Sequence, residues 1–249
     1  MRPCLRKIIS LVDTSQYLGS DLSNVARRVQ GLLRELTLFE GMDVAALERM
    51  AAGAVQVDLP GKTVIFKRDD ACRGLHVVVS GQVKLALQGA QGAERVVELV
   101  GPGGVFGEIA VLNGRHLLTA ETLADTRLVH FAKALVLAEL ERTPAFTRGL
   151  VAILSRRFQH LLGALEDCTL RSGTERVAGY LLSRLPPHPV NGHAVITLPA
   201  KKGVIASQLN LTHEHFSRLL HEIEAAGLIQ VDGREILISD IGRLRTYPA

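Results

Sequence analysis

Three polar residues near the C-terminal end of the chain have the types and spacing that suit reading of DNA bases. Glu214, Ser217 and Arg218 stand at positions i, i+3 and i+4, so on a helix they share one face near its N-terminal end. An arginine can donate to guanine O6 and N7 together, and a glutamate can accept from cytosine N4. The plainer interpretation is the solvated face of an amphipathic helix, so the neighbouring elements have to decide between the two.

The residues around this triplet predict two short helices joined by a tight turn between Ile205 and Gly227. Asn210 tolerates the left-handed conformation in which the first helix would end, and Thr212 is a suitable N-cap for the second. Four apolar residues repeat at the helical period and would form the buried face of the second helix: Phe216, Leu219, Leu220 and Ile223.

The segments on either side complete a winged helix-turn-helix. Before it, a helical pattern through Val177 and Leu185 ends at Pro186-Pro187, and a short strand is expected at Val195–Leu198. After it, two alternating runs at Leu228–Val231 and Glu235–Ile238 flank Asp232-Gly233, which is a strong hairpin signal.

The first half of the chain has the pattern of a small antiparallel roll. Short runs rich in β-branched residues follow one another with glycines between them, which is typical of a barrel or jelly roll. The expected strands lie around Val55–Leu59 and at Thr63–Phe66, Gly74–Val79, Val83–Leu87, Arg95–Val100, Thr119–Thr122 and Arg127–Phe131.

A long helix is expected between the roll and the C-terminal domain. Thr143-Pro144 marks its start, and one set of apolar residues is spaced 3, 4, 3, 4, 3 along it, which is a coiled-coil seam. The seam residues are Val151, Leu154, Phe158, Leu161, Leu165 and Cys168. Leu150, Ile153 and Leu162 form a second apolar strip, so one strip can pack on the roll while the other meets a second copy. The alternative is a helix buried on two sides within one monomer.

These patterns predict an α+β protein in four parts. Residues 1–34 are a loose or helical N-terminal extension, 35–142 the roll, 143–172 the dimerisation helix and hinge, and 173–249 the winged helix-turn-helix domain.

Composition limits the functional class. The chain has 249 residues, 47% of them hydrophobic, and a net charge of +4, which is compatible with a polyanionic partner. The three cysteines are far apart and odd in number, which favours a reducing bacterial cytoplasm over a disulfide framework. No apolar run approaches the length of a membrane span, and no nucleophile–base arrangement or phosphate-binding glycine loop indicates an enzyme.

The order of these parts resembles the CRP/FNR transcription regulators. The segments VSGQVKL (79–85), GPGGVFGEIAVLNG (101–114) and LTHEHFSRLLHEIEAAGLIQVDGREI (211–236) carry the resemblance, which runs from about Leu36 to Ser239. It implies a double-stranded β-helix roll like a cyclic-nucleotide-binding domain, a homodimer, and double-stranded DNA and RNA polymerase as partners.

The resemblance also implies particular DNA contacts. Glu214, Ser217 and Arg218 match the E-x-x-S-R arrangement of the FNR branch, which reads a TTGAT-like half-site, whereas the CRP branch has Gly at the position of Ser217 and Arg at that of His213. Lys202 and Thr212 match positions that hold phosphates, and His213 could touch phosphates or bases. The expected target is therefore a TTGAT-N4-ATCAA-like palindrome.

The effector pocket departs from the cyclic-AMP pattern. Gly107 and Glu108 match the family's ribose-binding segment, but Leu117 and Leu118, next to Thr119, stand where the phosphate-binding Arg-Ser pair is expected. Because a phosphate there would lose its charge-assisted hydrogen bonds, cyclic AMP is not the expected effector. A regulator that binds DNA without an effector, a cyclic-nucleotide-responsive regulator, and an effector module of a kinase or channel are the alternatives.

Metal cofactors are limited by the cysteine count. With Cys4 and Cys72 alone in the N-terminal half, one chain cannot assemble a four-cysteine iron–sulfur cluster. The chain then looks most like the nitric-oxide-responsive dissimilatory nitrate respiration regulators, which are associated with haem. The candidate axial ligands are His76, His116, His130 and His160, each of which could equally be an ordinary core or surface histidine.

Overall fold

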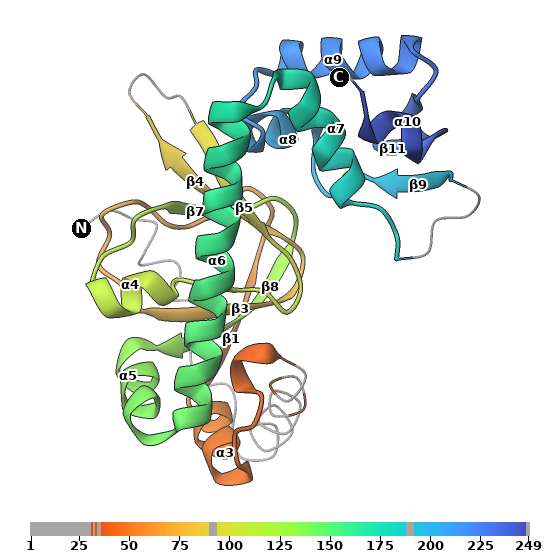
Figure 1. Ribbon diagram of the computed structural model, residues 1–249. Helices are drawn as coiled ribbons and strands as arrows, with labels where there is room; N and C mark the ends of the chain where they lie inside the picture. The colour runs from red at the N-terminus through yellow and green to blue at the C-terminus, as the bar shows by residue number, and fades with distance from the viewer. Residues whose placement is uncertain (1–30, 32, 34–35, 90–93, 188–191, 248–249) are drawn as a thin grey trace.

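A computed structural model describes residues 31, 33, 36–89, 94–187 and 192–247. Figure 1 shows a β-roll and a C-terminal domain joined by one long helix, α6 (Pro144–Leu170), which runs along the roll and ends beneath the C-terminal domain. The expected α+β architecture is confirmed. The proposed N-terminal extension lies almost entirely outside the described residues.

Two four-stranded sheets form the roll. One has the order β1-β8-β3-β6 and the other β2-β7-β4-β5, and every pairing is antiparallel. The strands are β1 (Ala54–Leu59), β2 (Val64–Phe66), β3 (Gly74–Ser80), β4 (Val83–Gln88), β5 (Glu94–Val100), β6 (Val105–Phe106), β7 (Thr119–Thr122) and β8 (Thr126–Ala132). Both faces of β8 are covered: Leu128 packs in the roll interior, whereas Val129 and Phe131 on the other face pack in the cluster that the helices share.

Sequence patterns found seven of these strands but not β6 or helix α4 (Glu108–Asn113). β6 has two residues, too few for an alternation, and α4 is a single six-residue helix between glycines. Gly107 has φ of +91° and Gly114 φ of +84°, a backbone region that glycine reaches without steric cost. The tight turn at Gly107 places Glu108 at the start of α4, with its side chain directed into the roll.

Short helices close the lower end of the roll. They are η2 (Thr37–Phe39), α3 (Val44–Ala52) and α5 (Lys133–Arg142), and Asp43 caps α3 by accepting from the amide of Ala46 at 2.7 Å. Glu139 is buried and accepts from Arg49 at 2.7 Å. Helix α6 begins at Thr143-Pro144 as predicted, and the Thr143 hydroxyl at its N-cap position donates to Glu139 instead of capping the helix.

Two faces of α6 differ in burial. Phe146 and Leu150 are buried in the roll core, and Ile153 packs beside them. A strip beside this face is exposed, with the seam residues Val151, Phe158, Leu161 and Leu165 each at 44% or more. Leu162 is also exposed, at 50%, so its predicted place on one strip with the buried Leu150 is wrong. Two predicted seam residues depart from the exposed strip: Leu154 is half-buried against the roll core, and the Cys168 thiol accepts a hydrogen bond from Arg95 of β5 at 2.8 Å. Four of the six predicted seam residues are therefore exposed on α6.

The C-terminal domain is a winged helix-turn-helix with its own core. Its elements are α7 (Gly173–Ser183), β9 (Ala194–Thr197), α8 (Lys202–Gln208), α9 (His213–Ala225), β10 (Ile229–Asp232), β11 (Glu235–Ile238) and α10 (Ile241–Arg245). The β10–β11 hairpin turns at Gly233, as expected, and β9 pairs with β11. α7 begins with a capping box between Ser172 and Glu175, so the break after Leu170 is a structured corner between two helices.

One side chain ties the two domains together. The Ser207 hydroxyl accepts from the amide of Val96 and donates to the carbonyl of Glu94, both at 2.9 Å. Because β5 is the edge strand of its sheet, these backbone groups are free of a neighbouring strand, and α8 takes that place.

None of the helices in the described part of the chain combines the length and apolar character needed to cross a membrane.

Replacing either of two glycines of α6 is expected to have opposite effects on the free energy of unfolding. A Cβ at Gly149 would lie 2.3 Å from the backbone oxygen of Leu38, whereas one at Gly163 would meet nothing within 4 Å. We expect Gly149→Ala to lower the free energy of unfolding by about 1–3 kcal/mol through overpacking. We expect Gly163→Ala to raise it by roughly 0.5–1 kcal/mol through helix propensity. Urea unfolding of both variants measures the difference, and equal effects would contradict the close crossing of α6 and η2.

Candidate functional site: an exposed reading helix and a closed sensory pocket

Helix α9 presents its polar face outward because its apolar face is buried in the core of the domain. Phe216, Leu219, Leu220 and Ile223 are buried in the core of the C-terminal domain, as their spacing predicts. Thr212 caps the helix by accepting from the amide of His215 at 3.1 Å. Asn210 has φ of +56° and forms the turn before it. In Figure 1, α9 lies across the end of the domain farthest from the roll.

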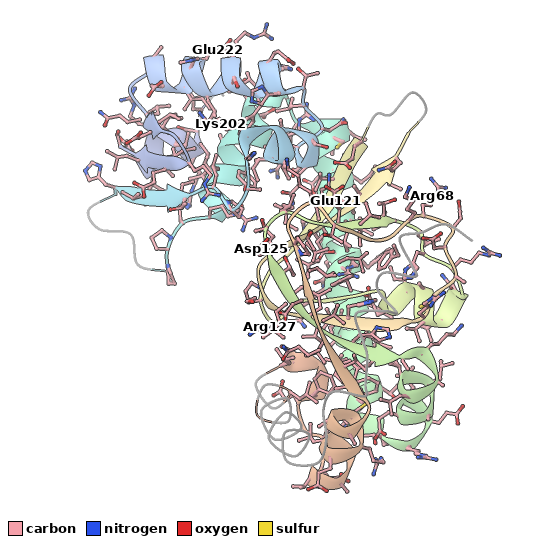
Figure 2. All side chains as sticks on the ribbon, turned by 180° about the vertical axis from the view of Figure 1, so that it is seen from behind. Arg68, Glu121, Asp125, Arg127, Lys202 and Glu222 are labelled. Atoms are coloured by element: carbon pink, nitrogen blue, oxygen red, sulfur yellow. The ribbon has the colours of Figure 1, made fainter. Side chains whose placement is uncertain are left out.

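The three predicted base-reading residues come together on this outer face. Glu214 and Arg218 are exposed, with the Arg218 side chain at 68%, and Ser217 is half-buried between them. Arg218 has one weak acidic neighbour, Glu222 at 3.8 Å, which Figure 2 shows on the outside of the helix. The backbone amide of Glu214 itself, followed by the Thr212 hydroxyl, lowers the pKa of the Glu214 carboxyl, so this carboxylate is available as an acceptor.

The predicted phosphate-binding residues lie at helix N-termini. Thr212 and His213 are exposed where α9 begins, and Lys202 is the half-buried first residue of α8. Free amides and the helix dipole favour an anion at the start of α9.

Sequence analysis missed one residue that positions the turn. Arg176 of α7 donates through Nη1 to the carbonyls of Leu209 at 2.7 Å and Asn210 at 3.2 Å. These carbonyls end α8 without an intrahelical partner, so Arg176 stabilises the corner that sets the angle of α9. An isolated arginine in a helical pattern carries no signal of such a long-range contact.

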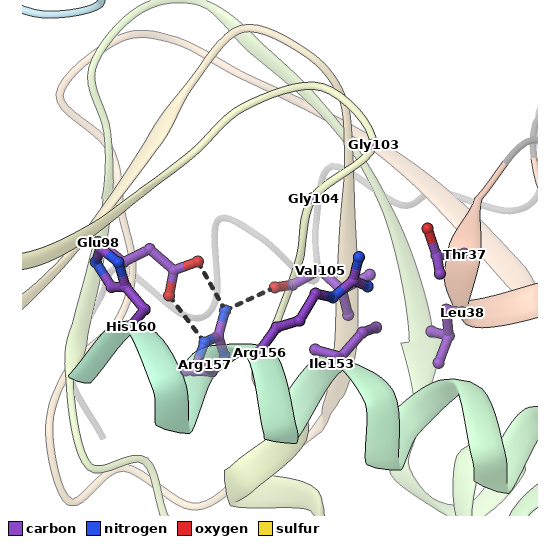
Figure 3. A pocket seen from close by; sticks show the side chains of 10 residues that line it. All are labelled: Thr37, Leu38, Glu98, Gly103, Gly104, Val105, Ile153, Arg156, Arg157 and His160. Carbon is purple, nitrogen blue, oxygen red and sulfur yellow. Dashed lines mark hydrogen bonds and ion pairs between the residues drawn. The ribbon is translucent and has the colours of Figure 1, made fainter. Parts of the chain in front are cut away.

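The candidate effector pocket is closed by an arginine from the long helix. The Glu108 side chain is fully buried and pairs with Nη1 of Arg157. Arg157 also pairs through Nε with Glu98 of β5 at 2.8 Å and donates through Nη2 to the carbonyl of Val105 at 3.1 Å. One guanidinium therefore holds two carboxylates of the roll against α6, as Figure 3 shows for Glu98 and Val105.

A cavity of about 310 Å³ opens beside this ion pair. Its walls are the Gly103–Val105 turn, Thr37 and Leu38, and α6, from which Arg156, Arg157 and His160 reach toward it. Two arginines and one glutamate give the cavity a net positive lining that suits an anionic or hydrogen-bonding ligand.

The two leucines predicted to line the effector pocket, Leu117 and Leu118, have different surroundings in the structure. Leu118 packs against the roll core and Thr119 is buried, its hydroxyl accepting from the amide of Arg68 at 3.2 Å. Leu117 is 52% exposed and does not line the interior, which corrects its assignment to the pocket. Leu117 lies in a bend before β7, outside any strand, and its side chain faces solvent.

Three of the four candidate haem ligands form a buried cluster. Nδ1 of His130 lies 3.2 Å from Nε2 of His76, and His116 stacks on Phe66 with ring centroids 3.5 Å apart. His76 stacks in turn on Phe106 at 4.9 Å. Aromatic rings fill the space on these faces, so the cluster does not fit a haem macrocycle. His160, exposed on α6, stands apart from it.

Comparisons with known proteins agree with both halves of the structure. Residues 56–143 match the cyclic nucleotide-binding domain family, and residues 175–247 match the Crp-like helix-turn-helix domain family. A "CRP-like cAMP-activated global transcriptional regulator" of Mycobacterium tuberculosis is 24% identical over 216 residues, covering 86% of this chain and 96% of the relative.

Regulators of nitrogen fixation are similar to a comparable degree. The FixK protein of Bradyrhizobium diazoefficiens is 25% identical over 219 residues, covering 87% of this chain and 92% of that protein. The structure of FixK2 from Bradyrhizobium japonicum superposes with a TM-score of 0.68 at 25% identity, covering 79% of this chain and 98% of FixK2.

A cyclic-nucleotide-binding-like roll joined by a long helix to a winged helix-turn-helix defines a two-domain DNA-binding regulator. The chain belongs to the CRP/FNR superfamily of transcription regulators, as the two domain matches in this order and the relatives along most of its length show.

The buried histidines predict that stability falls in mild acid. Burial lowers the pKa values of His76 and His130 and brings that of His116 to about 4. In the unfolded chain the same groups protonate near an ordinary pKa of about 6.5. The unfolded state therefore binds more protons below that pH, so stability is complete above it and is lost as the pH falls toward 4.

We expect a slope of about 1.4 kcal/mol per pH unit for each histidine that stays neutral in the folded state. Urea unfolding between these limits measures it. His116→Phe, which keeps the stack on Phe66, should reduce the slope, and His160→Gln on the exposed surface should leave it unchanged. An identical slope in all three proteins would contradict this account.

Proposed function

We propose that the protein binds a TTGAT-N4-ATCAA-like palindrome as a homodimer and that an effector at the roll controls this binding. The exposed Glu214–Ser217–Arg218 face is the observation that carries the proposal. Its residue types can hydrogen-bond base edges in the major groove, and Ser217 matches the FNR-type arrangement instead of the CRP-type one.

The exposed strip of α6 supports the homodimer. Phe158 is 62% and Leu165 60% exposed on a 27-residue helix, together with Val151, Leu161 and Leu162. A row of large apolar side chains on one helix face is costly in water and is covered when a second copy packs in parallel. Two reading helices related by a two-fold axis then match two half-sites one turn of DNA apart.

The ion pair of Arg157 supports control through the roll. An effector that competes for Arg157 would release α6 from the roll, and α6 is connected to the reading helix through α7 and α8. A ligand shifts such an equilibrium by as much as it prefers one arrangement over the other. Because the paired charges are buried, the arrangement in which Arg157 holds α6 on the roll and the arrangement in which α6 is released differ substantially in free energy.

Cyclic AMP is not the effector in this proposal, although the M. tuberculosis relative is named as activated by it. Here Glu108 is occupied by Arg157, and Leu118 packs into the core where a cyclic phosphate needs a cation. A regulator that needs no effector is the alternative, in which Arg157 holds α6 permanently. RNA polymerase is the further partner that the family resemblance implies.

Haem is the second candidate effector, with His160 as its ligand. His160 is exposed and lines the 310 Å³ cavity, next to the cations of Arg156 and Arg157 that could pair with haem propionates. Such a haem would supply a gas-binding iron, as in the nitric-oxide-responsive regulators that the sequence resembles. An iron–sulfur cluster is not part of the proposal.

The DNA assignment predicts the effect of removing one guanidinium. We expect Arg218→Ala to weaken binding to a labelled TTGAT-N4-ATCAA duplex by on the order of 10- to 100-fold per half-site, because a bidentate guanine contact is lost. Fluorescence anisotropy at fixed salt measures the dissociation constant.

Arg68→Ala on the roll is the matched control, since this exposed arginine removes the same charge far from α9 (Figure 2). It should leave the affinity unchanged. If Arg218→Ala binds the palindrome as tightly as this control does, the reading face is wrongly assigned.

A further inference from the structure

A second cavity, of about 340 Å³, lies where the long helix meets the DNA-binding domain. Residues of α6, α7 and the end of α8 line it, and Val97 of β5 closes it from the roll. Its volume is within the range of pockets that hold small metabolites. It is separate from the pocket of Glu108 and shares only His160 with the cavity beside it.

The lining of this interdomain cavity has an excess of positive charge. The lining contains three arginines, Arg171, Arg176 and Arg184, and one carboxylate, Asp167. Asp167 pairs with Arg171 at 3.1 Å. Arg176 donates to neutral carbonyls. Arg184 lies over the Tyr180 ring at 5.1 Å and has no carboxylate within ion-pair distance in the described chain. Two guanidinium charges thus have no anionic partner among the described residues.

Buried polar atoms in the same lining have unused hydrogen-bonding capacity. Tyr180 is only 8% exposed, and its hydroxyl, which lies near Arg184, makes no hydrogen bond of normal geometry within the described residues. The side-chain oxygen of Gln208 is likewise buried without a partner there. Leaving such groups unsatisfied is costly, so a ligand that bonds them gains affinity.

Small residues keep the cavity open between these groups. Gly163 and Ala164 on α6 face Gly179 on α7 across it. A Cβ at Gly163 would meet nothing within 4 Å, so a larger side chain there would grow into free space.

We propose that this interdomain cavity is a second ligand site, which binds a small anion bearing a phosphate or carboxylate group. Arg184 and Arg176 supply the charge, the Tyr180 hydroxyl donates to the anion, and the Gln208 oxygen accepts from a hydroxyl or amine of the ligand. Guanidinium groups match both kinds of oxyanion in geometry.

An occupant would join the two domains in the arrangement that Ser207 already holds. The cavity walls include α6 and β5 on one side and α7 and α8 on the other, so a bound anion stabilises this placement of the reading helix. This regulatory consequence rests on the proposed DNA-binding function, whereas binding of the anion does not depend on it.

Isothermal titration calorimetry of the full-length protein, without DNA, tests the site. Inorganic pyrophosphate and citrate are the probes, one for each class of oxyanion. We expect saturable binding of at least one of them, which identifies the class. Arg184→Gln should weaken it by on the order of tenfold or more, the range for a charge-assisted hydrogen bond. Gly163→Leu should weaken it to a similar degree by filling the cavity while keeping every charge.

Arg68→Gln is the matched control, because it removes one exposed cation of the roll outside the cavity lining and should leave anion binding unchanged. Thermal unfolding establishes that each variant is folded before titration. If neither pyrophosphate nor citrate binds the wild-type protein, the proposal is wrong. Retention of wild-type affinity by Gly163→Leu would also overturn it, because it would locate the anion outside the cavity.

Discussion

The arrangement of the two domains depends on the ion pairs that the guanidinium of Arg157 makes with Glu108 and Glu98. Arg157 stands with 11% of its side chain exposed between the fully buried Glu108 and the partly buried Glu98. Removing one partner of such a buried pair typically costs about 3–5 kcal/mol, because the remaining charge stays desolvated. Since Arg157 belongs to α6 and both carboxylates to the roll, the pair fixes the long helix to the sensory domain at its midpoint.

From that fixed point, the geometry is passed on to the reading helix by short, well-defined contacts. The capping box at Ser172 starts α7 directly after α6, and Arg176 clamps the turn that leads into α9. Ser207 ties α8 back to the edge of β5, so the DNA-binding domain touches the same strand that supplies Glu98. These contacts form a continuous chain from the roll to the helix that carries Arg218, which is the arrangement that the proposed control through the roll requires.

Local patterns were enough for most of the elements, though not for β6 or α4, and for the residues of the reading face. The period-two runs of the roll, the Asp232-Gly233 turn and the Phe216–Ile223 stripe each depend on neighbours in sequence, and the structure has all of them. What the sequence did not reveal depends on residues far apart in the chain. Arg157 meets Glu108 across 49 positions, Arg176 meets Leu209 across 33, and Leu117 faces solvent from a bend that the sequence pattern did not predict. The histidines looked like separate candidates in the sequence, whereas the fold stacks His116 on Phe66 and His76 on Phe106 and places His130 against His76.

DNA affinity of an Arg157→Met variant tests the central role of the ion pair most directly. Met keeps most of the length and apolar stem of the side chain while removing its charge, and Arg157 lies on α6 against the roll and not on the reading face. The account predicts that the variant binds the palindrome on the order of tenfold more weakly than wild type, because a released α6 leaves a smaller fraction of dimers with both reading helices correctly spaced. It also predicts that cyclic AMP leaves the wild-type affinity unchanged. A folded, dimeric Arg157→Met protein with wild-type DNA affinity would contradict it.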